Sequence, residues 1–272
     1  MTSRDLESVA QTLVAEGKGI LAADETIPTL TRRFDTLSIQ STEQSRCTYR
    51  EMLFTSPGAA EFISGVIMYD ETIRQKSSGG APLAEALKVQ GILPGIKVDT
   101  GAKPLASSPE ETVTEGLDGL RNRLSEYRSM NARFAKWRAV IRVTDSLPSS
   151  ACVSANAHAL ARYAALCQEQ ELMPIVEPEV LMDGSHTIER WERSPGPFFT
   201  RCSTRFPTRL SRSRGCCSSR TWSSPARRAL ASLRSRMSQL RHCAVCVGTC
   251  LQRFLVSCSC RAAKMHALRL PI

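Results

Sequence analysis

No segment of the sequence has the run of ~20 apolar residues that a membrane-spanning helix requires, so we expect no membrane partner. Cysteine is scarce in residues 1–191, which contain only Cys47, Cys152 and Cys167 of the chain's 11 cysteines. Scattered cysteines of this kind predict reduced thiols rather than a disulfide framework. We therefore expect a cytoplasmic protein.

A second set of absences marks residues 192–272. This segment contains no Asp, Asn or Tyr, and its only Ile is the last residue. It holds 15 Arg, one Lys and one acid, so it carries more positive charge than the whole chain, whose net charge is +10. Residues 1–191 are therefore net negative, as is ordinary for a soluble cytosolic domain. We divide the chain into an organised part, residues 1–191, and an Arg-, Ser- and Cys-rich segment, residues 192–272.

Apolar runs of strand length alternate with amphipathic helical patterns in the organised part. The predicted strands are Gly19–Ala23, Ile63–Tyr69, Gly95–Asp99, Trp137–Ile141 and Met173–Glu177, and the clearest helical patterns cover Gly116–Met130 and Ala151–Cys167. Repeated strand–helix–strand units indicate a parallel sheet. Because no Gly-rich phosphate fingerprint follows the first strand, the pattern favours an α/β fold of the (β/α)₈ barrel type over a dinucleotide-binding fold.

Ionisable side chains gather where these strands end. One follows the first strand, and three pairs lie two residues apart on later strands: Asp24, Lys97 with Asp99, Lys136 with Arg138, and Glu177 with Glu179. A spacing of two places both side chains of a pair on one face of a strand. For any single pair, solvation at a strand end is the favoured explanation. Four such ends meeting at one barrel mouth indicate an acid–base site for an anionic substrate.

Five segments, in order along the chain, resemble class I fructose-bisphosphate aldolases. They are Gly17–Glu25, Phe62–Thr72, Gly95–Gly101, Phe134–Arg138 and Ile175–Val180, and the resemblance covers roughly residues 5–190. It implies a (β/α)₈ TIM barrel, usually a homotetramer. It also implies cleavage of the small-molecule sugar phosphate fructose 1,6-bisphosphate to glycerone phosphate and glyceraldehyde 3-phosphate in glycolysis, without a cofactor or a metal.

The resemblance also implies catalytic roles at matching positions. Glu177 matches the general acid–base residue that moves protons around the carbinolamine, and Glu179 is its neighbour on the same face. Asp24 matches the carboxylate that handles the C4 hydroxyl group during carbon–carbon cleavage. Lys136 matches the lysine that stabilises negative charge beside the nucleophile.

Cations for the substrate phosphates are predicted in the same way. Arg33 and Arg46 match arginines that bind phosphate, and Lys97 and Arg138 complete the predicted substrate-binding set. Guanidinium and ammonium groups suit this work because a bisphosphate needs a cation at each end. The segment Glu25–Pro28 departs from the family, which more often has Glu-Ser followed by a small residue and Gly.

The imine-forming lysine of the family is missing from this chain. The resemblance places it in a Leu-Leu-Lys-Pro-Asn-Met segment about 40 residues beyond Glu177, where a desolvated amine attacks the ketone. Position 219 is a serine, and the only lysine after Val180 is Lys264. We therefore expect this chain to be inactive as written.

A shift of reading frame explains the missing lysine. We built new codons from the third base of each residue and the first two bases of the next. Cys216–Ser223 then permits Leu-Leu-Lys-Pro-Asn-Met-Val, with the lysine codon straddling Ser218 and Ser219. In the same frame, Gln252–Lys264 permits Ala-Val-Pro-Gly-Val-Val-Phe-Leu-Ser-Gly-Gly-Gln, which resembles the family's seventh-strand phosphate loop. The hypothesis is that one base was lost near Trp191–Arg193.

This hypothesis predicts an incomplete barrel of about five βα units, followed by a disordered or poorly packed segment. An unclosed barrel has two exposed edges and an uncovered interior, so we also expect poor solubility.

The alternative is a non-catalytic barrel fragment fused to a basic, Cys-rich tail that binds zinc or nucleic acid. The candidate zinc ligands are His242, Cys243, Cys246, Cys250, Cys258 and Cys260, and the 15 arginines are candidate phosphate contacts. These spacings match no standard zinc finger, and the basic residues follow no helical stripe. We therefore favour the frameshift and expect no nucleic-acid partner.

Overall fold

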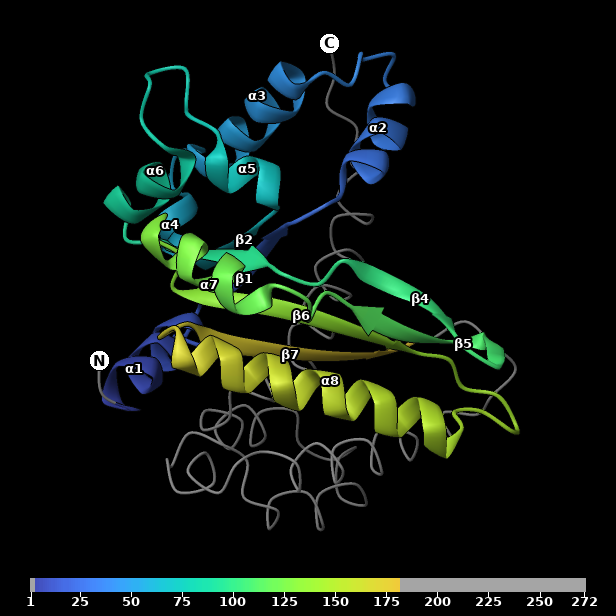
Figure 1. Cartoon of the computed structure of the whole chain (residues 1–272). Coiled ribbons are helices and arrows are strands. Elements are labelled where there is room, and N and C mark those ends of the chain that lie inside the picture. The colour runs from blue at the N-terminus through green and yellow to red at the C-terminus, as the bar shows by residue number, and fades with distance from the viewer. Residues whose placement is uncertain (1–2, 182–272) are drawn as a thin grey trace, which may run out of the picture.

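The computed structural model describes residues 3–181, which form a five-stranded sheet with helices and a separate two-stranded hairpin (Figure 1). The strands are β1 (Gly19–Ala23), β2 (Ile63–Met68), β3 (Leu93–Lys97), β4 (Gly101–Leu105), β5 (Ser108–Glu115), β6 (Phe134–Ile141) and β7 (Met173–Val180). The helices are α1 (Ser3–Leu13), α2 (Ile27–Asp35), α3 (Glu43–Phe54), α4 (Ala59–Phe62), α5 (Asp70–Arg74), α6 (Leu83–Val89), α7 (Leu120–Ser129) and α8 (Ser150–Glu169).

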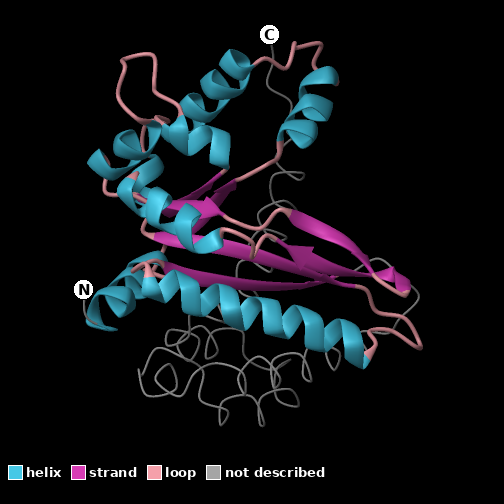
Figure 2. Cartoon of the chain, in the orientation of Figure 1, coloured by secondary structure: helices cyan, strands magenta, loops and turns pink. Residues whose placement is uncertain are grey.

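The sheet is half of a parallel α/β barrel. Its strand order is β1-β2-β3-β6-β7, and every neighbouring pair is parallel. Within the sheet, a connection that contains at least one helix follows each of β1, β2, β3 and β6. Helix α8, the longest in the described residues, runs beside β6 and β7 (Figure 2). This confirms the predicted barrel-type fold with five strands. The predictions for residues 192–272 lie outside the described residues.

The outer face of the sheet carries the larger apolar core. On β6, Ala135, Trp137 and Ala139 alternate onto this face and are fully buried. The indole ring of Trp137 packs against Tyr163 of α8, with ring centroids 5.4 Å apart. The Tyr163 hydroxyl donates to the main-chain oxygen of Ala135 at 2.7 Å and lies 3.2 Å from that of Ile175. Helix α8 is thereby fixed to the two strands that carry most of the ionisable residues.

The amino-terminal end of the inner face is filled by a smaller apolar core. The phenyl ring of Phe134 lies so close to β3 that a Cβ atom on Gly95 would approach it to 2.2 Å. A Cβ on Gly65 of β2 would meet Leu13 of α1 at 2.6 Å. Glycine at both positions leaves room for the phenyl ring and for α1. Met173 and Ile175 of β7 complete this layer.

A hairpin after β3 was not predicted. The sequence analysis placed a strand at Gly95–Asp99, whereas β3 ends at Lys97 and the chain turns out into β4 and β5. The two hairpin strands close at their base, where Thr100 N donates to Glu115 O. Gly116 has a φ of 125°, and helix α7 therefore begins at Leu120 rather than at Gly116 as predicted.

The hairpin is anchored to the strands of the half-barrel. The hydroxyl groups of Thr112 and Thr114 donate to the main-chain oxygens of Val140 and Arg138 on β6. The buried Asn156 of α8 accepts from Thr114 N and donates to Thr112 O. β5 is therefore fixed to both β6 and α8.

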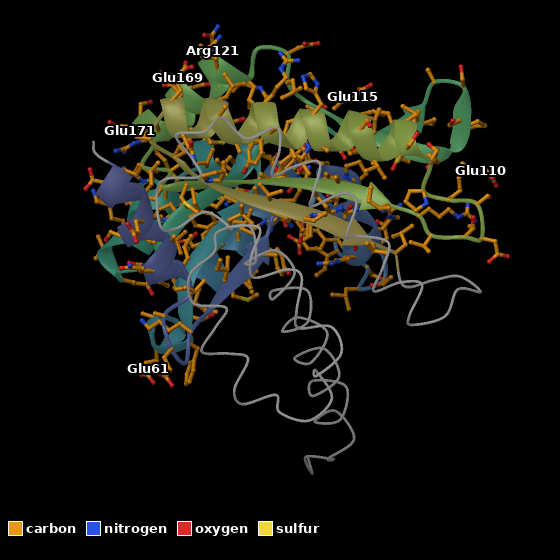
Figure 3. The ribbon with its side chains drawn as sticks, turned by 90° about the horizontal axis from the view of Figure 1, so that it is seen from below. Glu61, Glu110, Glu115, Arg121, Glu169 and Glu171 are labelled. Atoms are coloured by element: carbon orange, nitrogen blue, oxygen red, sulfur yellow. The ribbon has the colours of Figure 1, made fainter. Side chains whose placement is uncertain are left out.

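The remaining strand boundaries differ only in extent. β6 begins at Phe134, three residues before its predicted start, and β7 continues to Val180, three residues past its predicted end. On the outside of the half-barrel, Arg121 of α7 pairs with Glu169 of α8 at 2.6 Å (Figure 3). Because both side chains are exposed, this pair contributes little to stability.

Candidate active site

The inner face changes from apolar to charged along the strands. On β6, Phe134 lies in the apolar layer, and Lys136 and Arg138 follow on the same face toward the carboxyl end of the strand. On β7, Ile175 is followed in the same way by Glu177 and Glu179. The strands are in register, so Arg138 lies opposite Glu177. The ionisable groups therefore gather at the carboxyl ends of the strands, where the active sites of barrel enzymes lie.

Lys136 lies between two carboxylates from different strand ends. Its Nζ atom is 3.3 Å from Oδ2 of Asp24, just after β1, and 3.0 Å from Oε2 of Glu177 on β7. The three side chains are only 10–15% exposed. The structure thus brings together, across the full width of the half-barrel, three of the four residues predicted to be catalytic.

Burial and neighbouring charges affect the pKa values of Lys136 and Glu177 differently. Burial raises the pKa of Glu177, although the charge of Lys136 opposes that shift. Burial alone would lower the pKa of Lys136, but the charges of Asp24 and Glu177 outweigh it and raise the pKa. Lys136 therefore remains a cation near neutral pH, whereas Glu177 is shifted toward holding a proton.

Glu179 belongs to a separate ion pair. Its Oε2 atom lies 3.0 Å from Nε of Arg138. Both residues lie two positions further along their strands than Glu177 and Lys136. Arg138 is the more exposed partner, at 48%. The pair forms the rim of the charged layer beside the contact between Lys136 and Glu177.

Asp99 joins the side chain of Lys97 to the main chain of Arg138. Its Oδ1 atom is 2.7 Å from Nζ of Lys97 and accepts from Gly101 N, and its Oδ2 atom accepts from Arg138 N. Lys97 is also the register partner of Lys136 on β6. The sequence analysis noted Asp99 by its spacing but did not predict it as a site residue. Its side chain is only 3% exposed, so it acts as a buried tie between the two strand ends.

The two predicted phosphate-binding arginines have carboxylate partners other than Asp24 and Glu177. Arg33 of α2 is 58% exposed and pairs with Glu25 at 2.5 Å. Arg46 of α3 is bound through Nε and Nη2 to both carboxylate oxygens of Glu71, which raises the pKa of the guanidinium. Their binding of phosphate remains a prediction.

A further residue beside Asp24, Arg50, was missed by the sequence analysis. Arg50 of α3 is almost fully buried and binds the Glu25 carboxylate as well as main-chain oxygens beside Asp24. An arginine within an amphipathic helix gives no signal of burial, since most such arginines are exposed. Only the fold shows where these side chains lie.

The three described cysteines are free and buried, as predicted. Burial raises the pKa of Cys152 to about 11 and also raises that of Cys47, with further contributions from neighbouring carboxylates. Cys167 is the most deeply buried of them and its pKa is raised as well. Thiols in this state are poor nucleophiles, so none of these cysteines is a site residue.

Residues 3–181 contain neither a candidate metal site nor a candidate membrane-spanning helix. No group of three or more His, Cys, Asp or Glu side chains in this part of the chain is placed to hold a metal ion. None of its helices is long and apolar enough to cross a membrane. Ser218 and Ser219, across which the lysine codon is predicted to lie, are outside the described residues, as are the candidate zinc ligands.

A half-barrel with a lysine between two carboxylates at the carboxyl ends of its strands is the architecture of an acid–base barrel enzyme. Residues 5–195 match the family described as "Glycolytic: Fructose-bisphosphate aldolase class-I". The chain belongs to the class I fructose-bisphosphate aldolase family.

Individual relatives agree with this assignment. A "probable fructose-bisphosphate aldolase class 1" of Xanthomonas axonopodis pv. citri is 58% identical over 189 residues, which are 70% of this chain and 57% of that protein. The cytosolic fructose-bisphosphate aldolase 4 of Arabidopsis thaliana is 51% identical over 174 residues, 64% of this chain and 44% of its own. A solved structure of the Plasmodium falciparum aldolase, in complex with TRAP and a small-molecule inhibitor, superposes with a TM-score of 0.72 at 42% identity.

The match is partial on both sides. The Plasmodium structure is covered to 59% and this chain to 75%. The chain spans about half the length of the curated relatives that it matches.

Proposed function

We propose that this chain derives from an enzyme that cleaves fructose 1,6-bisphosphate through an imine, and that it retains the acid–base half of that site without the amine. The observation that carries the proposal is the contact of Lys136 with both Asp24 and Glu177 on the inner face of the half-barrel. Membership of the aldolase family supports the substrate and the products, glycerone phosphate and glyceraldehyde 3-phosphate.

Each of the three residues suits one step of that chemistry. An amine and the C2 ketone form a carbinolamine, which loses water to give an iminium ion, and Glu177 is suited to move the protons because its pKa is raised by burial. Cleavage of the C3–C4 bond gives its electron pair to the C2–C3 double bond of an enamine, and the iminium π pair moves onto nitrogen. The C4 hydroxyl proton passes to a base, the role proposed for Asp24, as C4 becomes the aldehyde carbon. Lys136 remains cationic and stabilises negative charge in the same step.

The nucleophile itself is proposed to be encoded out of frame. Lys136 does not replace it, because attack on a ketone requires a neutral amine and its two carboxylate partners keep Lys136 protonated. The codons of Cys216–Ser223 permit the missing lysine motif in another frame. The family match ends at residue 195, close to the proposed break at Trp191–Arg193, and this supports the division of the chain at residues 191 and 192.

Location and assembly follow from the relatives. We propose a cytoplasmic location, since relatives from Arabidopsis and spinach are named as cytosolic or cytoplasmic isozymes. We propose that the ancestral enzyme was a homotetramer, as is usual in the family. The inhibitor and TRAP belong to the Plasmodium structure and are not proposed as partners of this chain.

A tail that binds zinc or nucleic acid remains the second candidate. It is carried only by the composition of residues 192–272, with eight cysteines and 15 arginines. Metal analysis of the purified chain and its salt-dependent retention on DNA distinguish it from the frameshift. Zinc at one equivalent, or retention lost only at high salt, would favour the tail as an evolved domain.

Two measurements test the main proposal. Sequencing of genomic DNA and transcript across codons 190–194 is expected to show one base fewer than an uninterrupted aldolase frame requires. Purified chain of this exact sequence is expected to show no cleavage of fructose 1,6-bisphosphate in a coupled assay, with EDTA present to remove contaminating metal-dependent aldolase. An intact frame supported by independent reads, or turnover by this chain, would overturn the proposal.

A further inference from the structure

Arg50 of α3 is a buried arginine with no role in the chemistry described so far. Its side chain is only 1% exposed. Its guanidinium donates to the main-chain oxygens of Ala23 and Glu25, the latter at 2.9 Å, and also to the carboxylate of Glu25. Burying a charged group costs folding free energy unless it is paired and well bonded. These bonds offset the cost of burial, and they also place the cation beside the chain segment that carries Asp24.

The two carbonyl groups that Arg50 binds flank the catalytic carboxylate. Ala23 precedes Asp24 and Glu25 follows it. A single guanidinium bound to both carbonyls fixes the two residues that join Asp24 to the chain, and so fixes the direction of its side chain. Asp24 lies just beyond the last residue of β1, where no strand pairing holds it. Arg50 supplies the support that the strand no longer provides.

Arg50 is also connected, through Glu25, to Arg33, one of the two arginines predicted to bind phosphate. Oε2 of Glu25 accepts from Arg50, and Oε1 of Glu25 accepts from Arg33. Arg33 is half exposed, and among residues 3–181 its carboxylate partner is Glu25. Glu25 thus connects the buried Arg50 to the rim of the mouth.

We propose that Arg50 is a positioning residue of the barrel mouth, which holds Asp24 against Lys136 by binding the carbonyl groups on both sides of it. The inference rests on the proposed function for the catalytic meaning of Asp24. The geometry that it concerns, the 3.3 Å contact between Asp24 and Lys136, is tested separately from turnover.

Removal of Arg50 is expected to change the pKa of Lys136 in opposite directions, depending on whether Arg50 acts through its charge or by positioning Asp24. If Arg50 acted through its charge alone, its removal would take a cation from the mouth and raise the pKa of Lys136. If Arg50 positions Asp24, its removal lets that carboxylate move away, and the pKa of Lys136 falls because the charge of Asp24 is one of those that raise it. Glu177 and Lys97, which also lie beside Lys136, are unchanged in both cases.

The experiment follows the pH midpoint of Lys136 acetylation in the full chain, measured by peptide mass spectrometry on the soluble fraction. Arg50→Met and Asp24→Asn are each expected to shift the midpoint down by about one pH unit. In the Asp24→Asn background, Arg50→Met is expected to give no further downward shift. Arg74→Met is the control, because Arg74 pairs with the carboxylates of Asp70 and Glu126 and not with Asp24, Glu25 or their main-chain oxygens. It is expected to leave the midpoint unchanged.

An unchanged or raised midpoint in Arg50→Met would overturn the proposal, as would an additive downward shift in the double variant. If Asp24→Asn itself leaves the midpoint unchanged, the contact between Asp24 and Lys136 is wrong, and both the proposed function and the role of Arg50 fail; a shift in Asp24→Asn with none in Arg50→Met overturns the role of Arg50 alone. Where circular dichroism shows that Arg50→Met does not fold, Arg50→Lys replaces it. This variant keeps the charge but loses the planar fork, so a smaller downward shift is expected. If the full chain yields too little soluble protein, the frame-restored chain carries the same variants and the same measurement.

Discussion

One lysine between two carboxylates sets the chemistry at the residue scale. Lys136 is kept charged by Asp24 and Glu177, while Glu177 is pushed toward its protonated form by burial. Opposite tendencies in adjacent groups are how acid–base sites divide their roles. The same contact explains why Lys136, though a lysine in the right barrel, does not substitute for the missing nucleophile.

The raised pKa of Glu177 predicts a specific dependence of stability on pH. The folded chain binds the Glu177 proton more tightly than the unfolded chain, so the free energy of unfolding falls as pH rises from the unfolded pKa, about 4.3, through the higher folded value. Glu177→Gln removes this fall. The difference in free energy of unfolding between the original chain and Glu177→Gln is therefore expected to change across this pH window. The expected change is about 1.4 kcal/mol for each unit by which the pKa of Glu177 is raised. Urea denaturation between pH 4 and pH 8 measures it.

The control for this prediction is Glu169→Gln. Glu169 is exposed and its pKa is lowered by its hydrogen bonds with Arg121, so its linkage to folding has the opposite sign. A stability difference between the original chain and Glu177→Gln that does not vary with pH would contradict the assignment of Glu177 as a buried, proton-holding carboxyl.

Close packing of Phe134 on Gly95 predicts a coupled pair of substitutions. A Cβ atom at position 95 would lie 2.2 Å from the phenyl ring, so Gly95→Ala is expected to destabilise the fold by about 1–3 kcal/mol. Phe134→Leu removes part of the ring, and the double variant is expected to be more stable than the sum of the single changes implies. Gly79→Ala is the control, because a Cβ there would meet only Ser77 at 3.8 Å. Additive effects in chemical denaturation would show that the two residues do not contact as described.

At the scale of elements, the free edge of β7 is distinctive. Met173 N donates to Arg133 O and Leu181 N to Ile141 O, so odd-numbered residues of β7 bond to β6. Alternate residues of a parallel strand direct their amide groups to opposite sides. Pro174 and Pro178 therefore face the other edge, which pairs with no strand within residues 3–181. This edge lacks two amide donors, a feature that limits edge-to-edge association.

The prolines of β7 predict how the half-barrel aggregates. Pro174→Val combined with Pro178→Val adds two donors to the free edge, and we expect the aggregated fraction to rise several-fold at equal concentration. Pro94→Val is the matched control, because Pro94 lies on β3 between two paired strands. Light scattering and size-exclusion chromatography measure the outcome. Equal aggregation in both variants would show that the β7 edge is already covered.

The sequence predicted the parallel strands well because each is a buried apolar run, as Ile63–Met68 shows. It predicted the meeting of Asp24, Lys136 and Glu177 because strand ends of a barrel converge. The hairpin β4–β5 was missed because its strands are mostly exposed and polar, and their fixed place depends on Thr114 and Asn156, which bond across 42 residues. Contacts of that range leave no local pattern.

The same limit applies to the supporting residues of the site. Arg50 and Asp99 are buried ions whose partners lie on other elements, and a sequence pattern ranks such residues as exposed. The proposed break near residue 191 could be inferred from the sequence, in contrast, because composition and reading frame are properties of the sequence alone.

At the scale of the whole molecule, the mouth of the half-barrel has an incomplete set of charges. Its inner layer contains three cations, Lys97, Lys136 and Arg138, and four carboxylates, Asp24, Asp99, Glu177 and Glu179. With Glu177 protonated these charges balance, and a balanced layer offers a bisphosphate little net attraction. We expect the further cations of a working site to come from the part of the relatives that this chain does not match.

Restoring one base between codons 190 and 194 is therefore expected to restore the whole enzyme. The reconstructed frame places a lysine across Ser218 and Ser219, and borohydride with dihydroxyacetone phosphate is expected to trap a reduced adduct on the peptide that contains it. A restored chain with methionine in place of that lysine is the control and should trap none. The chain as written should trap none either, since its carboxylate-paired Lys136 remains protonated. An adduct on Lys136 or Lys264, or a restored chain that folds without forming any adduct, would show that the lost frame does not explain the missing chemistry.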